Sequence, residues 1–137
     1  MTKFSTAILA IGLAALCSSL ATASDFDGSR ALLCVPTDAF ACDGLDACER
    51  VTVEELNIPQ FVNIDFKKKK MGGVLASGEE STTAIQQVKK AEGRTILQGA
   101  ENGRGWSMVL DQATGNMSAA VAGEDAGFLL FGACTVR

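Results

Sequence analysis

The C-terminal segment decides the fold: residues 97–110 read LQGAENGRGWSMVL, and residues 111–137 read DQATGNMSAAVAGEDAGFLLFGACTVR. The Asn102-Gly103 pair favours a two-residue hairpin, because a type I′ turn needs positive φ at both central residues. Asp111–Asn116 predicts a second tight turn, with Gly115 in the left-handed conformation. This part of the chain therefore predicts antiparallel strands joined by tight turns.

The same pattern extends back towards residue 60. Apolar side chains at 62, 64 and 66 recur with the period of two that is typical of strands, and residues 82–90 continue as one strand. Turn signals recur about every ten residues from 68 to 125. With a first strand at Ala31–Val35, which ends at Pro36, we expect an all-β, up-and-down meander of about eight strands. Such a meander avoids exposed edges by closing into a barrel, whose interior is filled or holds one small ligand.

One short segment departs from the strand pattern. Thr52-Val53-Glu54-Glu55 fits a capping box, in which the Thr hydroxyl and the Glu three residues later satisfy each other's backbone amides. Asn57 and Pro59 then limit the segment. We expect one short helical turn near residues 52–56, with the alternative that residues 50–53 finish a strand.

Residues 1–23 have the features of a cleaved signal peptide. Lys3 supplies a positive charge, residues 4–16 are mostly apolar, and Ala21-Thr22-Ala23 places small residues at the cleavage positions. Leu16 precedes Cys17 where a lipid-modified protein would have a small residue, so we expect no lipid anchor. Residues 24–137 are then a single β-barrel-like domain.

Charge and hydropathy exclude two classes of partner. The 137-residue chain has a formal charge of −4, which becomes −5 once Lys3 is removed with the signal peptide. An acidic chain without a basic face is a poor nucleic-acid binder. No second apolar segment is long enough to span a bilayer. We expect no nucleic acid partner, no transmembrane anchor in the mature form, and a monomer.

Four cysteines remain after residue 23, and an even count in a small exported domain indicates two disulfides. We favour Cys42–Cys48 as a local link and Cys34–Cys134 as a bridge from the first strand to the last. In a closed barrel these two strands are neighbours, so the second bridge would hold the closure. The pattern Cys34–Cys42 with Cys48–Cys134 remains an alternative.

The chain lacks most of the usual catalytic side chains. It has no His and no Tyr, which excludes Ser-His-Asp and Cys-His catalysis and His-based metal sites. We therefore predict no catalytic residues, no cofactor and no metal. The densest group of acids could ligate calcium, but the EF-hand spacing is missing and a solvated acidic face is favoured. These acids are Asp38, Asp43, Asp46, Glu49, Glu54 and Glu55.

The candidate binding residues lie around the predicted hairpin tip. Trp106, Met108 and Leu110 share one face of a strand, which favours a place in the core. The functional alternative puts Trp106 at the barrel mouth beside Glu101, Asn102 and Arg104. Alanine-rich strands favour a tightly filled interior over a roomy pocket.

The chain shows two resemblances, one in particular segments and one in its general architecture. Leu32-Leu33-Cys34, the segment 52–61, Asn102–Ser107 and Phe131–Cys134 resemble a group of small uncharacterised exported proteobacterial proteins. A looser similarity in size, disulfides and meander links the chain to small periplasmic β-barrel inhibitors of proteases and lysozymes. The first resemblance implies export and a single domain. Neither carries an activity over to particular residues, because fold does not fix function.

These observations favour an exported, non-enzymatic binding module of the bacterial cell envelope. It would act in the periplasm or the extracellular medium, like an inhibitor, on an envelope or extracellular protein. The first alternative is a lipocalin-like carrier of a small hydrophobic ligand. The second is an envelope hydrolase that uses paired carboxylates.

Overall fold

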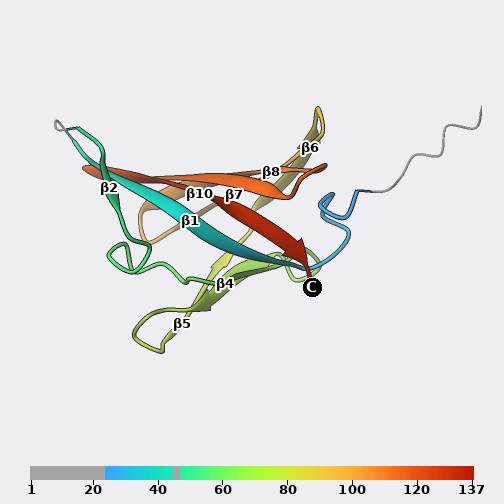
Figure 1. The fold of residues 1–137 in the computed structure, drawn as a ribbon, viewed down its shortest axis with the longest axis horizontal. Coiled ribbons are helices and arrows are strands. Elements are labelled where there is room, and N and C mark those ends of the chain that lie inside the picture. Colours follow the sequence, from blue (N-terminus) through green and yellow to red (C-terminus); the bar gives the residue numbers. More distant parts are fainter. Residues whose placement is uncertain (1–23, 45–46) are drawn as a thin grey trace, which may run out of the picture.

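The computed structural model describes residues 24–44 and 47–137, which form one all-β domain. Ten strands build a single antiparallel sheet (Figure 1). Their bounds are β1 Leu32–Asp43, β2 Glu49–Val51, β3 Val62–Asp65, β4 Lys70–Val74, β5 Glu80–Ala84, β6 Gln87–Ala91, β7 Arg94–Glu101, β8 Arg104–Asp111, β9 Asn116–Ala122 and β10 Ala126–Val136. The all-β prediction is confirmed, while the expected signal peptide at 1–23 lies outside the described residues.

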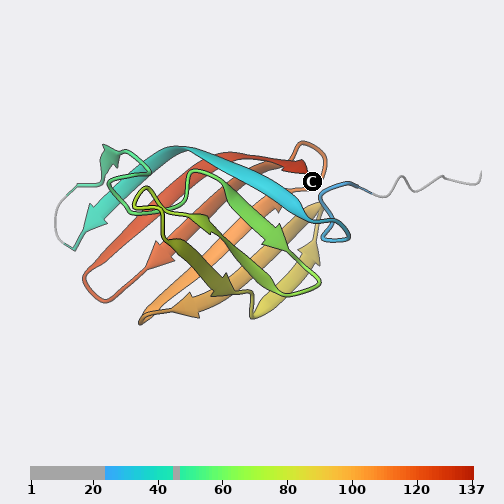
Figure 2. The same cartoon turned by 90° about the horizontal axis from the view of Figure 1, so that it is seen from below.

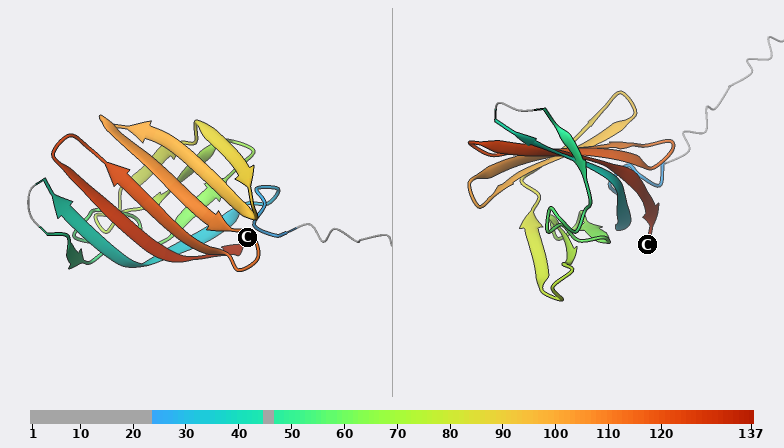
Figure 3. Two further views of the ribbon diagram at one scale, coloured as in Figure 1. Left: turned by 90° about the horizontal axis from the view of Figure 1, so that it is seen from above. Right: turned by 60° about the vertical axis from the view of Figure 1, so that its left-hand side comes forward.

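The sheet curves into half a barrel. Its strand order is β5-β4-β3-β1-β10-β9-β8-β7-β6, and the short β2 pairs with β1 beside this path. Figure 2 shows β3, β4 and β5 lying across the concave side of β7, β8 and β9, and Figure 3 shows the same arrangement from two further sides. The first and last strands are neighbours, as predicted, and the meander runs between them.

The predicted closed barrel is wrong, because the sheet stays open between β5 and β6. These strands are successive parts of one extended segment, so they cannot fold back and pair with each other. The amide of Ile85 donates to the carbonyl of Lys69 (2.8 Å), and that of Gln86 donates to the carbonyl of Gln98 (2.9 Å). The segment thus leaves β4 and joins β7 within two residues. The single strand expected at 82–90 is therefore divided in two, and together with the short β2 this raises the strand number from about eight to ten.

The first strand does not end at Pro36. It continues to Asp43, with a register shift against β10 between Pro36 and Asp38. On its other side β1 pairs with β3 as far as Cys34 and with β2 from Ala39 onward. Proline is tolerated here because its missing N–H falls at a bulge, where the ladder is already interrupted.

The helical turn predicted near residues 52–56 is absent. The two hydrogen bonds of the capping box do form: the Thr52 amide donates to Glu55 Oε2 (2.7 Å), and the Glu55 amide donates to Thr52 Oγ1 (3.2 Å). However, Asn57 has a φ of 52°, and the amides of Asn57 and Ile58 donate back to Glu54 and Val53. This is the arrangement that ends helices, and it follows the cap so closely that only a hydrogen-bonded turn fits between them.

The core lies on the concave face of the half-barrel. Its largest fully buried side chains come from β1, β3, β7 and β8, and include Leu32, Ile64, Leu97 and Leu110. A smaller buried cluster joins Ala39, Val53 and Leu130. Among residues 24–44 and 47–137, no helix could cross a membrane. The inner positions alternate with partly buried or exposed ones along β7 and β8, as their sequence period predicts.

Both predicted disulfides are confirmed, Cys34–Cys134 and Cys42–Cys48. Cys34 and Cys134 are direct partners in the ladder between β1 and β10. The Cys134 amide donates to the Gly115 carbonyl on the other side of β10 (2.8 Å), so its N–H points away from β1. The bridge therefore joins a pair without backbone hydrogen bonds, where opposite side chains approach most closely. Two disulfides are typical of proteins from oxidising compartments.

The long-range disulfide should contribute more stability than the local one. The chain-entropy model gives about 4 to 5 kcal/mol for a loop of about 100 residues and about 2 kcal/mol for one of about six. Cys34→Ala/Cys134→Ala should therefore lower the free energy of unfolding by roughly twice as much as Cys42→Ala/Cys48→Ala. Urea unfolding of the two double variants measures this difference. Equal losses would show that the bridge between β1 and β10 does not constrain the unfolded chain as proposed.

Acid should destabilise the protein, because several carboxylates are stabilised in the folded state. The backbone amides of Thr114 and Ala113 donate to Asp111 (2.9 and 2.8 Å) and lower the pKa of Asp111. A lowered folded-state pKa contributes stability above the unfolded value of about 3.9, and this is lost as pH falls through the folded value. The free energy of unfolding should fall below about pH 4, less steeply in Asp111→Asn than in the wild type. Urea unfolding at pH 2.5 to 7 tests this, and identical slopes would contradict it.

Candidate functional site: a cavity in the half-barrel

The four residues predicted at the hairpin tip all line one cavity of about 380 Å³. Glu101 ends β7, Arg104 begins β8, and Trp106 lies two residues further along β8. Asn102 occupies the turn, with φ values of 49° at Asn102 and 76° at Gly103, as a type I′ hairpin requires. The predicted hairpin is confirmed, and it stands at the rim of the cavity.

The cavity wall is mostly apolar and comes from both sides of the half-barrel. Met108 and Met117 line it from β8 and β9, and Met71 faces them from β4. The turn after β2 covers one side with Leu56 and Ile58. Methionine side chains are flexible and polarizable, so they adapt to the shape of what they contact. The alanine-rich strands favoured a tightly filled interior, whereas the structure has a cavity at this end of the half-barrel.

Trp106 is both a core residue and a cavity residue. It is 9% exposed and belongs to the main core cluster. Its indole Nε1 donates to Thr83 Oγ1 of β5 (3.3 Å), which links β8 to the free edge of the sheet. The ring lies over Gly99, its ladder partner on β7, where an added Cβ would come within 2.4 Å of the ring. Gly99 therefore makes room for the indole at the cavity wall.

The rim carries one acid and one base. Glu101 and Arg104 are direct ladder partners beside the turn, and both are exposed. Across the described part of the chain, neither side chain forms an ion pair. The aliphatic part of Arg104 lies against Gly123 in the turn between β9 and β10, where an added Cβ would be 3.4 Å from Arg104 Cγ. Both charges therefore stand at the cavity mouth without an ion-pair partner among residues 24–44 and 47–137.

Residues 24–27, where the described chain begins, fill the other end of the half-barrel. The Thr95 hydroxyl donates to the carbonyl of Phe26 (2.9 Å), and Lys90 Nζ lies 3.5 Å from Asp27 Oδ2. The Phe26 ring packs against Gly115, where an added Cβ would come within 2.6 Å of it. These contacts involve the starts of β7 and β9, whereas the cavity rim lies at the end of β7. The half-barrel thus has a filled end and a hollow end.

A second hollow of about 620 Å³ lies beside the β1 bulge. It is lined by residues 35–38, by residues 50–55 and by Phe61, which is 56% exposed. This is the stretch of β1 between β3 and β2, where the bulge interrupts the ladder. The hydrogen bond from Arg50 lowers the pKa of Asp38 at its edge. The contact between Arg50 and Asp38 thus accounts for these two charges at the edge of the hollow.

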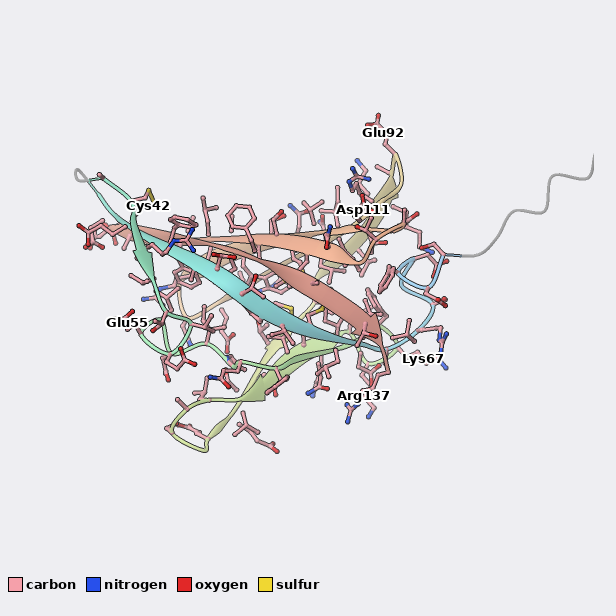
Figure 4. All side chains as sticks on the ribbon, viewed as in Figure 1. Cys42, Glu55, Lys67, Glu92, Asp111 and Arg137 are labelled. Atoms are coloured by element: carbon pink, nitrogen blue, oxygen red, sulfur yellow. A yellow bond between two sulfur atoms is a disulfide. The ribbon has the colours of Figure 1, made fainter. Side chains whose placement is uncertain are left out.

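The acidic residues that the sequence singled out do not gather as metal ligands where the structure describes them. Asp43, Glu49, Glu54 and Glu55 are exposed, and Asp46 lies outside the described residues. A hydrogen bond from Gln60 lowers the pKa of Glu54, and the Thr52 amide and hydroxyl lower that of Glu55. Figure 4 shows Glu55 and Asp111 at opposite ends of the molecule. Within the described ranges, no three His, Cys, Asp or Glu side chains gather as metal ligands.

Sequence reasoning missed most of the cavity wall. Met71 comes from β4, far in the chain from Met117 of β9 and Leu130 of β10, and only the folded sheet brings them together with Trp106. The period of two placed Trp106 and Met108 on one face of a strand, but it could not reveal the cavity beside them. No protein-family model, no curated protein and no solved structure matches this chain.

Gly99→Ala should disturb the cavity wall, because the added methyl group would overlap the Trp106 ring. We expect a loss of about 1 to 3 kcal/mol in unfolding free energy and a changed emission of Trp106, the single Trp of the chain. Gly105→Ala is the matched control, since an added Cβ there meets nothing within 4 Å. If both variants keep the wild-type emission, the indole does not lie over Gly99 in solution.

Proposed function

We propose that this protein is an exported, non-enzymatic binding module that holds a small, largely hydrophobic ligand in the half-barrel. The observation that carries the proposal is the cavity of about 380 Å³, with a mostly apolar wall and its charged groups at one rim. Small-molecule sites are concave, mostly apolar, and have a few polar groups that orient the ligand. This favours the carrier, which the sequence placed second, over a protein partner.

The energetics suit an apolar chain. Each CH₂ group removed from water contributes about 0.8 kcal/mol. The wall offers Met108, Met117, Val121 and Leu130 as contacts, and Trp106 already donates its N–H to Thr83, so it needs no polar partner from the ligand. A rigid half-barrel pays little ordering entropy on binding, because most of its wall is held in strands.

The position of the hairpin tip also supports a small ligand. A protein partner of the tip would need Glu101, Asn102 and Arg104 to project outwards as a recognition surface. All three are exposed, and together with Trp106 they also line the cavity, so a ligand in the cavity would meet them at its mouth. Export is supported by the apolar N-terminal segment 1–23 and by the two disulfides, which persist in oxidising compartments.

The test uses the emission of Trp106, which reports on the cavity without interference from any other Trp or Tyr. Titration with 1-dodecanol should change this emission saturably. Ala119→Phe, which places a ring in the cavity wall, should weaken binding at least tenfold. Ala120→Phe is the matched control, because Ala120 is the exposed neighbour on the same strand. If Ala119→Phe does not fold, Val121→Phe serves the same purpose.

Absence of saturable binding, or equal binding by both variants, would contradict a ligand in the cavity. Capture of an envelope protein that is lost in Glu101→Ala/Arg104→Ala, without any binding of dodecanol, would instead favour the protein-partner function. In both experiments, thermal unfolding shows whether each variant is folded.

A further inference from the structure

We infer that the ligand is a zwitterionic amphiphile, with an apolar chain in the half-barrel and a head group that carries one anion and one cation. This inference rests on the proposed function and specifies the chemistry of the ligand. It follows from the two charges at the rim and from the absence of charge deeper in the described wall.

The first step concerns where the charges lie. Among the described residues that line the cavity, Glu101 and Arg104 are the charged ones, and both stand at the hairpin end. The remaining polar lining is neutral, such as Ser81, Thr83 and Asn102. A charged group placed deep in the cavity would lose hydration without a partner of opposite charge. The ligand must therefore be apolar in its body and charged only at the mouth.

The second step concerns the sign of the head group. Glu101 and Arg104 face each other across the ladder, where opposite charges normally attract, yet they form no ion pair. The Arg104 stem lies beside Gly123 in the turn between β9 and β10. An anionic head would meet Arg104 but also the repulsion of Glu101, and a cationic head would meet the reverse. A head with both charges satisfies both side chains.

The third step concerns how strongly each rim charge affects the binding affinity. Both side chains are exposed, so water and salt weaken each contact. Discrimination on the order of two- to fivefold per charge is expected at low ionic strength. The apolar chain then supplies most of the affinity, and the rim selects among head groups.

The experiment compares four amphiphiles with the same dodecyl chain, each below its micelle concentration and at low ionic strength. Dodecylphosphocholine is zwitterionic, dodecyl phosphate anionic, dodecyltrimethylammonium cationic and dodecyl maltoside neutral. Trp106 emission measures each affinity. The zwitterion should bind most tightly, by two- to fivefold over either singly charged form, and high salt should remove this preference.

Two variants assign the charges. Arg104→Gln should lower affinity for the zwitterion and the anion, while Glu101→Gln should lower affinity for the zwitterion and the cation. Neither variant should change binding of the maltoside by more than twofold. Glu124→Gln is the matched control, since Glu124 is an exposed acid that does not line the cavity.

The outcomes separate the two proposals. Saturable binding of all four amphiphiles with equal affinity would overturn the zwitterionic head group and leave the hydrophobic site intact. Tightest binding of the anion, strengthened by Glu101→Gln, would overturn it in favour of an acidic head group. Failure of all four to bind would overturn the proposed function itself.

Discussion

The pairing of β1 with β10 is the constraint on which the rest of the structure depends. These strands match from Leu32 opposite Val136 to Asp43 opposite Ala126, and the Cys34–Cys134 disulfide joins them within this ladder. On one side of the pair lie β3, β4 and β5, and on the other lie β9, β8, β7 and β6. Without the pair, residues 85–86 would be the backbone link between the two groups of hairpins, and side chains alone would pack the groups against each other. One long contact therefore makes a single curved sheet from a sequential meander.

The opening opposite this pair gives the molecule its cavity. Since β5 and β6 belong to one extended segment, the sheet cannot complete a hydrogen-bonded ring there. Side chains act across the gap instead, as Trp106 of β8 donates to Thr83 of β5. The side chains that would fill a closed barrel of this size leave a hollow here, at the end away from Phe26. The same break that makes the barrel incomplete leaves room for the cavity.

The acidic residues serve local structure in this fold. Asp111, Glu54 and Glu55 each accept hydrogen bonds within a turn, and those bonds lower their pKa values. A carboxyl group used as a general acid needs the opposite shift, which burial or a neighbouring like charge provides. These exposed and locally bonded carboxylates therefore stabilise turns. The charged side chains that line the cavity, Glu101 and Arg104, lie at its rim.

The sequence by itself determined the features that depend on near neighbours and on cysteine number. The period of two, the Asn102-Gly103 turn, the left-handed Gly115 and the capping hydrogen bonds of Thr52 all act over a few residues, so local patterns reveal them. The preferred disulfide pairing was predicted from a closed barrel, in which the first and last strands are neighbours; the pairing is confirmed because β1 and β10 are neighbours although the sheet stays open elsewhere. The tertiary structure alone decided three things: the extension of β1 through Pro36, the loss of the helical turn and the opening at Ile85-Gln86. Each depends on which backbone groups a distant strand offers, and the cavity exists because β4 and β7 diverge at that opening, which no local pattern records.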